Sequence, residues 1–288
     1  MTIPPARLSG FTSTTPVPLY WREDGPASAK PLLVLHGGPG AHHDYLYPQM
    51  LALAARHRVI TYDQRGGGQS RTDDPAPITW QTQVDDLAQV IAERDLRDFA
   101  LVGYSWGGLL AMLHAIEASA TGMLPMPDRL ALISPAPITR EWRSEFESTL
   151  LARQRGPAIQ AMRAELSASA LRERDMDAYR QRSFELSVAG YFANPVLARS
   201  LTPFRVTGRV QQSIWESLGD FDLRPALRGV HLPVLVVHGR EDPIPLSSSE
   251  AVASALEGEL VVLESCGHVP YVEQPAVLFA AVERFLGA

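Results

Sequence analysis

Residues 99–111 read FALVGYSWGGLLA, an apolar run that passes through a glycine-flanked serine into a run of helix-forming residues. This order predicts a strand, a sharp turn and a helix, with Ser105 at the apex. Such a turn strains the serine backbone and brings the residues two before and two after it together, which favours glycine at both positions. Gly103 and Gly107 stand there. Because a G-x-S-x-G pattern arises by chance in about one chain in ten of this length, the rest of the sequence decides its meaning.

Strand-like and helix-like segments alternate on both sides of this turn. Two short strands are predicted within residues 10–25, and further strands over residues 31–35, 58–62, 99–102, 129–134, 234–237 and 259–264. Helices are predicted over residues 45–56, 79–94, after Ser105, and over 248–256 and 276–286. This alternation predicts an α/β fold in which a mostly parallel eight-stranded sheet carries helices on both faces.

The alternation stops between residues 138 and 229, a largely helical segment rich in arginine. We therefore expect residues 1–137 and 230–288 to form one catalytic domain, and residues 138–229 to form an inserted helical cap. An insertion at this point would lie above the carboxyl ends of the strands, where folds of this kind place their sites.

Composition narrows the class of partner. The 288 residues are 45% hydrophobic and carry a net charge of −6 without a basic block, so nucleic acid and anionic membrane are not expected partners. Residues 1–5 lack the pattern of a secretion signal, and no apolar run approaches the ~18 residues of a membrane span. The single cysteine, Cys266, leaves no internal disulfide. A cytoplasmic monomer or small homo-oligomer is expected.

Serine chemistry requires a base and a group that orients the base. In folds of this kind the chain order is serine, then an acid, then histidine. Asp242 follows a predicted strand by a short loop, and His268 lies in a loop after the next strand. Each residue alone also fits an ordinary turn or surface position. All three in this order predict a Ser105–Asp242–His268 triad.

The developing oxyanion needs backbone donors. Residues 36–40 read HGGPG, a loop that cannot continue its strand and leaves backbone N–H groups free. We expect the N–H groups of Gly38 and Trp106 to form the oxyanion hole, with Gly37 in contact with the substrate.

The remaining histidines and the cysteine suggest no second chemistry. No spacing among the histidines indicates a metal site, and no cofactor is expected. Cys266, which lacks a strand–turn–helix context, is interpreted as a small, partly buried residue that makes the site sensitive to thiol reagents.

Five motifs together resemble the α/β-hydrolase superfamily and, within it, the proline iminopeptidase (prolyl aminopeptidase) branch. They are HGGPG at 36–40, DQRGGGQS at 63–70, GYSWGG at 103–108, GRED at 239–242 and GH at 267–268. The resemblance implies an enzyme that releases an N-terminal residue, often proline, from a peptide or arylamide. It also implies acidic residues near the cap that bind the substrate's free amine.

The sequence departs from the branch at those acidic positions. Pro243 stands where some relatives have glutamate, and Pro203 lies near a second such position. A further pattern in the branch places a glutamate shortly before an aromatic pair, and near the pair that begins at Tyr191 this chain has Glu185, about one helical turn earlier than that pattern. Glu185 is then the best amine-binding candidate, with Glu216 behind it. Both glutamates also fit ordinary solvated helix positions.

The first hypothesis is a serine aminopeptidase or amidase of the proline iminopeptidase type, which takes a small-molecule or short-peptide substrate beneath the cap. The second keeps the machinery but changes the substrate to an uncharged ester, thioester or lactone, because an ammonium group needs a buried anion. A non-catalytic binding protein on the same scaffold is disfavoured, because no triad member is missing.

Overall fold

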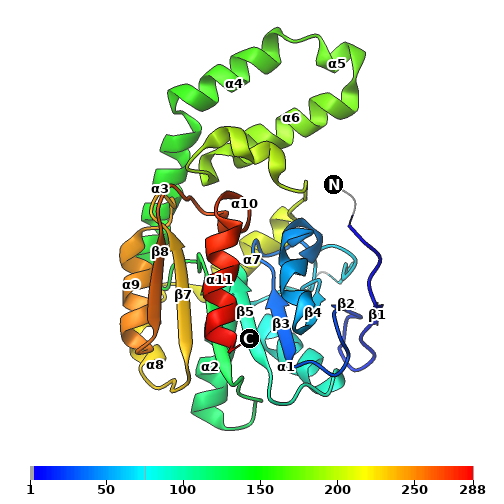
Figure 1. The fold of residues 1–288 in the computed structure, drawn as a ribbon, viewed down its shortest axis with the longest axis vertical. Helices are drawn as coiled ribbons and strands as arrows, with labels where there is room; N and C mark the ends of the chain where they lie inside the picture. The colour runs from blue at the N-terminus through cyan, green and yellow to red at the C-terminus, as the bar shows by residue number, and fades with distance from the viewer. Residues whose placement is uncertain (1–2, 75, 288) are drawn as a thin grey trace.

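A computed structural model describes residues 3–74 and 76–287, which fold around one sheet (Figure 1). Its strands lie in the order β1-β2-β4-β3-β5-β6-β7-β8, parallel from β4 through β8 and antiparallel where β2 pairs with β1 and β4. The strands are β1 Leu8–Phe11, β2 Tyr20–Asp24, β3 Pro31–Leu35, β4 Arg58–Tyr62, β5 Ala100–Tyr104, β6 Arg129–Ile133, β7 Val234–Gly239 and β8 Glu259–Leu263. The predicted fold, a mostly parallel eight-stranded sheet, is confirmed.

Helices cover both faces of the sheet, because successive side chains of a buried strand point to opposite sides. In β3, Leu33 and Leu35 join a core with α1, α2 and α9, whereas Leu32 and Val34 join a second core with η2 and α11. All four of these side chains are fully buried. The covering helices are α1 Trp80–Glu93, α2 Trp106–Thr121, α9 Leu246–Ala255, α10 Pro270–Glu273 and α11 Pro275–Leu286, with the 3₁₀ segments η1 His43–Leu46 and η2 Gln49–Ala55.

Helix α1, which has a clear amphipathic pattern in the sequence, begins where the sequence predicts. Thr79 caps α1 in a reciprocal arrangement, because its hydroxyl accepts from the Thr82 N–H at 3.3 Å and the Thr82 hydroxyl accepts from the Thr79 N–H at 2.8 Å. The apolar residues Val84, Leu87 and Val90 are buried. Capping and the apolar stripe together explain why this segment is a regular α-helix.

The prediction of one helix over residues 45–56 is wrong. The chain forms the two 3₁₀ segments η1 and η2 there, separated at Tyr47 and Pro48. Proline has no N–H to donate and disfavours the helical conformation in the residue before it. The buried side chains of Tyr45, Leu46, Met50 and Leu53 still pack on the sheet, and their apolar spacing imitates a helix in the sequence.

The segment between β6 and β7 is helical. Most of it lies at the carboxyl ends of the parallel strands, but α8 lies near the start of β7, at the other end of the sheet (Figure 1). Its α4 and α6 form a hairpin that projects farthest from the sheet, while Val210 and Ile214 of α7 and Leu227 of α8 belong to the core on the α1 and α2 face. The elements are α3 Arg140–Gln154, α4 Pro157–Ala168, α5 Leu171–Arg174, α6 Met176–Val188, η3 Ala189–Tyr191, η4 Pro195–Ser200, α7 Gly208–Leu218 and α8 Arg224–Leu227. The cap domain boundaries stay a prediction.

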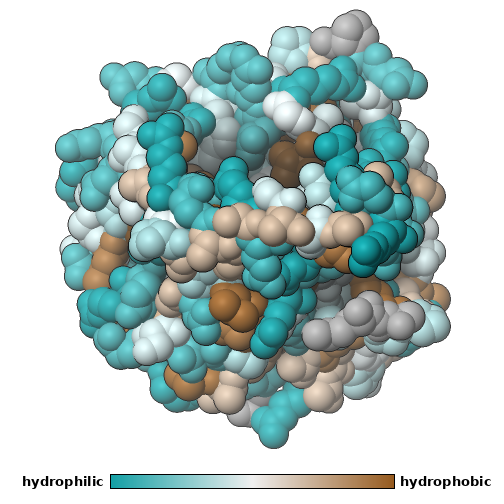
Figure 2. Space-filling view, turned by 90° about the horizontal axis from the view of Figure 1, so that it is seen from above, coloured by the Kyte–Doolittle hydropathy of each residue, from teal (hydrophilic) through white to brown (hydrophobic). Residues whose placement is uncertain are grey.

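Seen from above, the molecule presents a mostly hydrophilic surface on which hydrophobic side chains form small scattered patches (Figure 2). Leu151 of α3 and Met176 of α6 are among the large hydrophobic side chains exposed in this helical segment. Within residues 3–74 and 76–287, no helix combines the length and the hydrophobicity needed to cross a bilayer.

Candidate active site

Ser105 lies at the sharp turn between β5 and α2. Its backbone has φ 53° and ψ −119°, a conformation that non-glycine residues rarely adopt and that projects the side chain out of the sheet. A Cβ on Gly103 would lie 2.5 Å from the Gly107 carbonyl oxygen, and a Cβ on Gly107 would lie 2.2 Å from that of Leu35. The turn therefore needs both glycines, as the sequence predicts.

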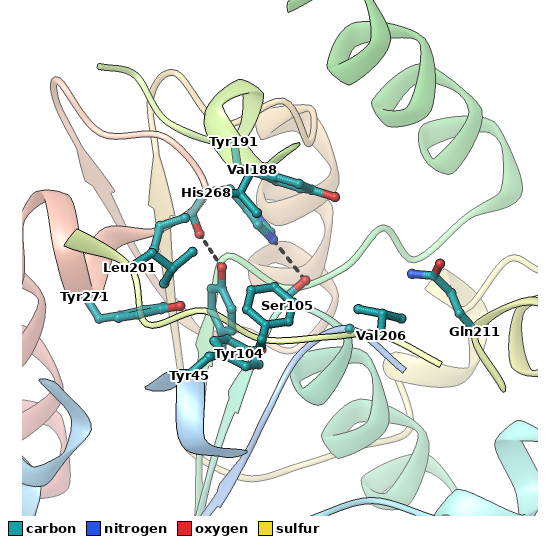
Figure 3. A pocket seen from close by; sticks show the side chains of 13 residues that line it. Tyr45, Tyr104, Ser105, Val188, Tyr191, Leu201, Val206, Gln211, His268 and Tyr271 are labelled. Carbon is teal, nitrogen blue, oxygen red and sulfur yellow. Dashed lines mark hydrogen bonds between the residues drawn. The ribbon is translucent and has the colours of Figure 1, made fainter. Parts of the chain in front are cut away.

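His268 lies in the loop that follows β8 and contacts Ser105, and Asp242 lies in the loop that follows β7 and contacts His268. The His268 Nδ1–H donates to Asp242 Oδ2 at 2.9 Å, with Oδ1 at 3.1 Å. Nε2 is therefore left as an acceptor for the Ser105 hydroxyl at 3.0 Å, the contact that Figure 3 shows between these two residues. Asp242 and His268 are both buried. The structure thus brings together the three residues that the sequence selects, in one hydrogen-bonded row.

The charge of Asp242 is stabilised by its neighbours. Burial alone would raise its pKa, but attraction to His268 and His238, with hydrogen bonds from His268 and the Ile244 N–H, lowers the pKa below the ordinary value. His238, in contrast, has its pKa lowered mainly by burial. An ionised Asp242 holds the imidazole of His268 in the tautomer that accepts at Nε2.

Gly38 presents a free backbone donor beside Ser105. Gly38 has φ +62°, lines the cavity at Ser105, and donates its N–H to no partner among the described residues. Trp106 is the first residue of α2, whose first N–H groups have no partner within the helix. This placement suits the predicted pair of oxyanion donors.

Gly37 has a different position. Its N–H donates to the Tyr45 hydroxyl at 2.7 Å, and a Cβ on Gly37 would lie 2.7 Å from the Ser105 Cβ. Glycine here lets the loop approach the serine closely. Gly37 is not among the residues that line the cavity, so direct substrate contact by Gly37 remains a prediction.

Sequence reasoning missed Gln64, which connects the two halves of the predicted oxyanion hole. The fully buried Gln64 amide donates from Nε2 to the His36 carbonyl at 2.8 Å and accepts at Oε1 from the Trp106 indole N–H at 2.9 Å. The Gln64 N–H also donates to His36 Nε2 at 3.1 Å. Its only sequence signal is its place in the DQRG motif.

His36 supports the same loop from inside. Its Nδ1–H donates to the Gly37 carbonyl at 2.9 Å, so Nε2 is the acceptor for the Gln64 N–H. Burial lowers the pKa of His36 to about 4. The imidazole is therefore neutral at neutral pH, as both hydrogen bonds require.

A small cavity of about 100 Å³ opens beside Ser105 and His268 (Figure 3). In the described part of the chain, no aspartate, glutamate, lysine or arginine lines it, and Gln211 faces it from the side opposite Tyr271. Its other side chains are aromatic or aliphatic, namely those of Tyr45, Tyr104, Val188, Tyr191, Leu201, Phe204, Val206, Val269 and Tyr271. This lining favours an uncharged group next to the reacting carbonyl.

The predicted cap residues lie in different places. Tyr191 lines the cavity, and its ring centroid lies 5.3 Å from that of His268. Glu185 is buried one helical turn before Val188, but its oxygens accept from Gln181 at 3.1 Å and from Arg182 at 2.7 Å. Glu216 is exposed on α7 and accepts from Gln212. Neither glutamate is among the cavity residues.

Cys266 is fully buried rather than partly buried. Burial raises the pKa of its thiol well above the ordinary value. A buried, protonated thiol is a poor nucleophile, so the expected sensitivity of the site to thiol reagents is not supported.

Comparisons with known proteins identify the family and the fold. A family model described as "Alpha/beta hydrolase family" matches residues 32–282. The proline iminopeptidase of Lactobacillus delbrueckii subsp. bulgaricus is 28% identical over 269 residues, which cover 89% of this chain and 90% of that protein. Two solved structures at 22% identity share the fold. VinJ has a TM-score of 0.71, and the match covers 98% of this chain and 99% of VinJ. The proline iminopeptidase of Mycobacterium smegmatis has a TM-score of 0.69, and the match covers 97% of this chain and 98% of that protein.

Proposed function

This chain belongs to the alpha/beta hydrolase family, and on that basis we propose that it is a serine hydrolase with Ser105, His268 and Asp242 as its catalytic triad. The observation that carries the proposal is the hydrogen-bonded row from Ser105 Oγ through the imidazole of His268 to the carboxylate of Asp242. The strained turn at Ser105 and the free donor at Gly38 support it.

The reaction follows from these contacts. Ser105 Oγ attacks the substrate carbonyl while His268 Nε2 takes the hydroxyl proton, and the N–H groups of Gly38 and Trp106 stabilise the oxyanion. His268 then gives the proton to the leaving amine or alcohol, and an acyl group remains on Ser105. A water molecule, deprotonated by His268, releases the acid and restores the serine. Asp242 stabilises the imidazolium in both halves.

The first substrate class is an N-terminal residue amide, prolyl or small aminoacyl, of a small peptide. It is supported by the similarity to the Lactobacillus relative named proline iminopeptidase. Such a substrate brings an ammonium group, for which Glu185 is the candidate anchor, one helical turn before the cavity residue Val188. For this role Glu185 would exchange its contact with Arg182 or Gln181 for the ammonium.

An uncharged ester or lactone is the second substrate class, favoured by the cavity itself. Among the described lining residues no carboxylate faces the position of the acyl group, and four tyrosines surround it. Burying an ammonium group without a counter-charge costs several kcal/mol. An uncharged acyl group avoids that cost.

Steady-state hydrolysis of two substrate sets separates the classes. One set is prolyl and alanyl arylamides with a free amine, each paired with its N-acetyl version, and the other is short-chain aryl esters. An aminopeptidase hydrolyses the free-amine arylamides but not their N-acetyl versions, and its activity should fall in Glu185→Gln. Turnover of esters alone would identify the second class. Loss of every activity in Ser105→Ala is expected for both, and wild-type turnover in that variant would overturn the proposal.

A further inference from the structure

Three successive amides hold the loop that carries His268, and each has a different acceptor. The Cys266 N–H donates to Glu241 Oε2 at 2.9 Å, and the Gly267 N–H donates to Glu273 Oε2 at 2.7 Å. The His268 N–H donates to the carbonyl of Tyr191 at 2.7 Å. One of these acceptors belongs to the helical insertion, so the position of His268 depends on that insertion.

Glu273, at the end of α10, joins the same two segments through its carboxylate. Its Oε1 accepts from the N–H groups of Ala193 at 2.9 Å and Asn194 at 3.3 Å, while its Oε2 accepts from Gly267. One side chain therefore binds three backbone donors, of which Gly267 lies 6 positions from Glu273 in the sequence and Ala193 lies 80 positions from it. Charge-assisted hydrogen bonds to backbone N–H groups are stronger than those between neutral groups.

The two segments that Glu273 joins are in direct backbone contact. A Cβ on Gly267 would lie 2.3 Å from the Tyr191 carbonyl oxygen and 2.7 Å from the Ala193 nitrogen. No side chain fits between them, and the His268 N–H bonds to the Tyr191 carbonyl, so we expect residues 191–194 to move together with Gly267 and His268.

The same part of the insertion forms a wall of the cavity. Val188 and Tyr191 line it, and the Tyr191 ring lies against the imidazole of His268. Whatever holds residues 191–194 in place therefore fixes both the wall that an acyl group contacts and the base that activates Ser105. Glu273 is outside the cavity and does not reach the reacting atoms.

We propose that Glu273 is a positioning residue that joins the Tyr191 wall of the cavity and His268 into one rigid unit, so that acyl-group selectivity and proton transfer depend on the same carboxylate. The inference rests on the proposed function, because it assigns His268 as the base. It predicts that loss of Glu273 weakens activation of Ser105 and also reduces the preference for acyl groups long enough to touch Tyr191.

The test compares Glu273→Gln and Glu273→Ala with the wild type. A glutamine keeps one acceptor oxygen and so retains part of the junction. Glu264→Gln is the matched control, because Glu264 is an exposed carboxylate near the same loop that pairs with Arg240. Two readouts are needed. The first is the rate at which a fluorophosphonate labels Ser105. In this reaction Ser105 Oγ forms a bond to phosphorus, fluoride leaves, and the serine proton passes to His268. The second is kcat and KM for p-nitrophenyl acetate and p-nitrophenyl hexanoate.

We expect the labelling rate and kcat of Glu273→Gln to fall by about 10- to 100-fold, because small misplacements of a base are costly. The ratio of kcat/KM for hexanoate over acetate should fall as well, while Glu264→Gln stays within about twofold of the wild type. Glu273→Ala should be at least as impaired as Glu273→Gln.

Folded Glu273 variants that keep the wild-type labelling rate and the wild-type acyl preference would overturn the inference. A uniform loss of kcat with an unchanged acyl preference would also overturn it, because the wall and the base would then be independent. Failure of the proposed function looks different, since the wild type itself would resist the fluorophosphonate.

Discussion

Replacing Gln64 by methionine tests how the two predicted oxyanion donors are held together. Methionine is close in size to glutamine but offers no strong donor or acceptor. The substitution removes the hydrogen bond to the His36 carbonyl at 2.8 Å and the one from the Trp106 indole at 2.9 Å. It leaves the catalytic row of Ser105 and His268 untouched.

The magnitudes follow from those two contacts. Each buried polar group left without a partner costs about 1–3 kcal/mol, so the free energy of unfolding should fall by about 2–6 kcal/mol. Removal of an oxyanion donor costs about 10²–10³ in kcat. In Gln64→Met the donors are displaced and not removed, so we expect a fall in kcat of about 10- to 100-fold with little change in KM.

Three measurements are made on each variant: kcat and KM on the best substrate, the stability to thermal unfolding, and the affinity for a boronic acid that forms a tetrahedral adduct with Ser105. Boronic acid binding should weaken in parallel with kcat, because both depend on the oxyanion hole. Gln83→Met is the matched control, since Gln83 is equally buried but its amide donates to the Arg65 carbonyl at 3.2 Å and not to His36. It should lose stability and keep kcat. Equal kcat in Gln64→Met and the wild type would refute the reasoning.

Three further outcomes follow from the structure. Asp242→Asn should lower kcat by about 10⁴, because the tautomer of His268 is no longer fixed, and circular dichroism should show that the fold is kept. Gly37→Ala places a Cβ 2.7 Å from the Ser105 Cβ and should lower kcat by about 100-fold, with wild-type kinetics as the contrary result. Burial lowers the pKa of His36 from 6.5 to about 4, so the unfolded chain binds a proton that the folded chain excludes. The free energy of unfolding should therefore fall by about 3 kcal/mol as the pH drops from 6.5 to 4, and chemical denaturation of His36→Gln should show a smaller pH slope.

Local pattern was sufficient to predict much of this fold. Strands β3 and β4 begin and end at the residues expected, because each is a short apolar run followed by a loop of glycines or polar residues. The turn at Ser105 and the positions of Asp242 and His268 followed from chain order. These features depend on residues close together in the sequence or on the ends of parallel strands.

Features that depend on distant partners could not be predicted. The bonds of Gln64 reach residues 28 and 42 positions away, and those of Glu273 reach across about 80 positions. No local pattern encodes such contacts, because they form only when the sheet and the insertion are assembled. The 3₁₀ segments around Pro48 show the converse, since an apolar spacing typical of a helix is satisfied there by packing alone.

The central claim is that Ser105 carries the acyl group. It is tested most directly by acid-quenching the enzyme during turnover of p-nitrophenyl acetate and a prolyl arylamide, followed by peptide mass spectrometry. We predict an added acyl mass on Ser105 with at least one substrate and no adduct in Ser105→Ala. In His268→Ala, the acyl-enzyme formed from the activated ester p-nitrophenyl acetate should accumulate, because the base that deprotonates water is missing. An adduct on another residue, or turnover that persists in Ser105→Ala, would contradict the account.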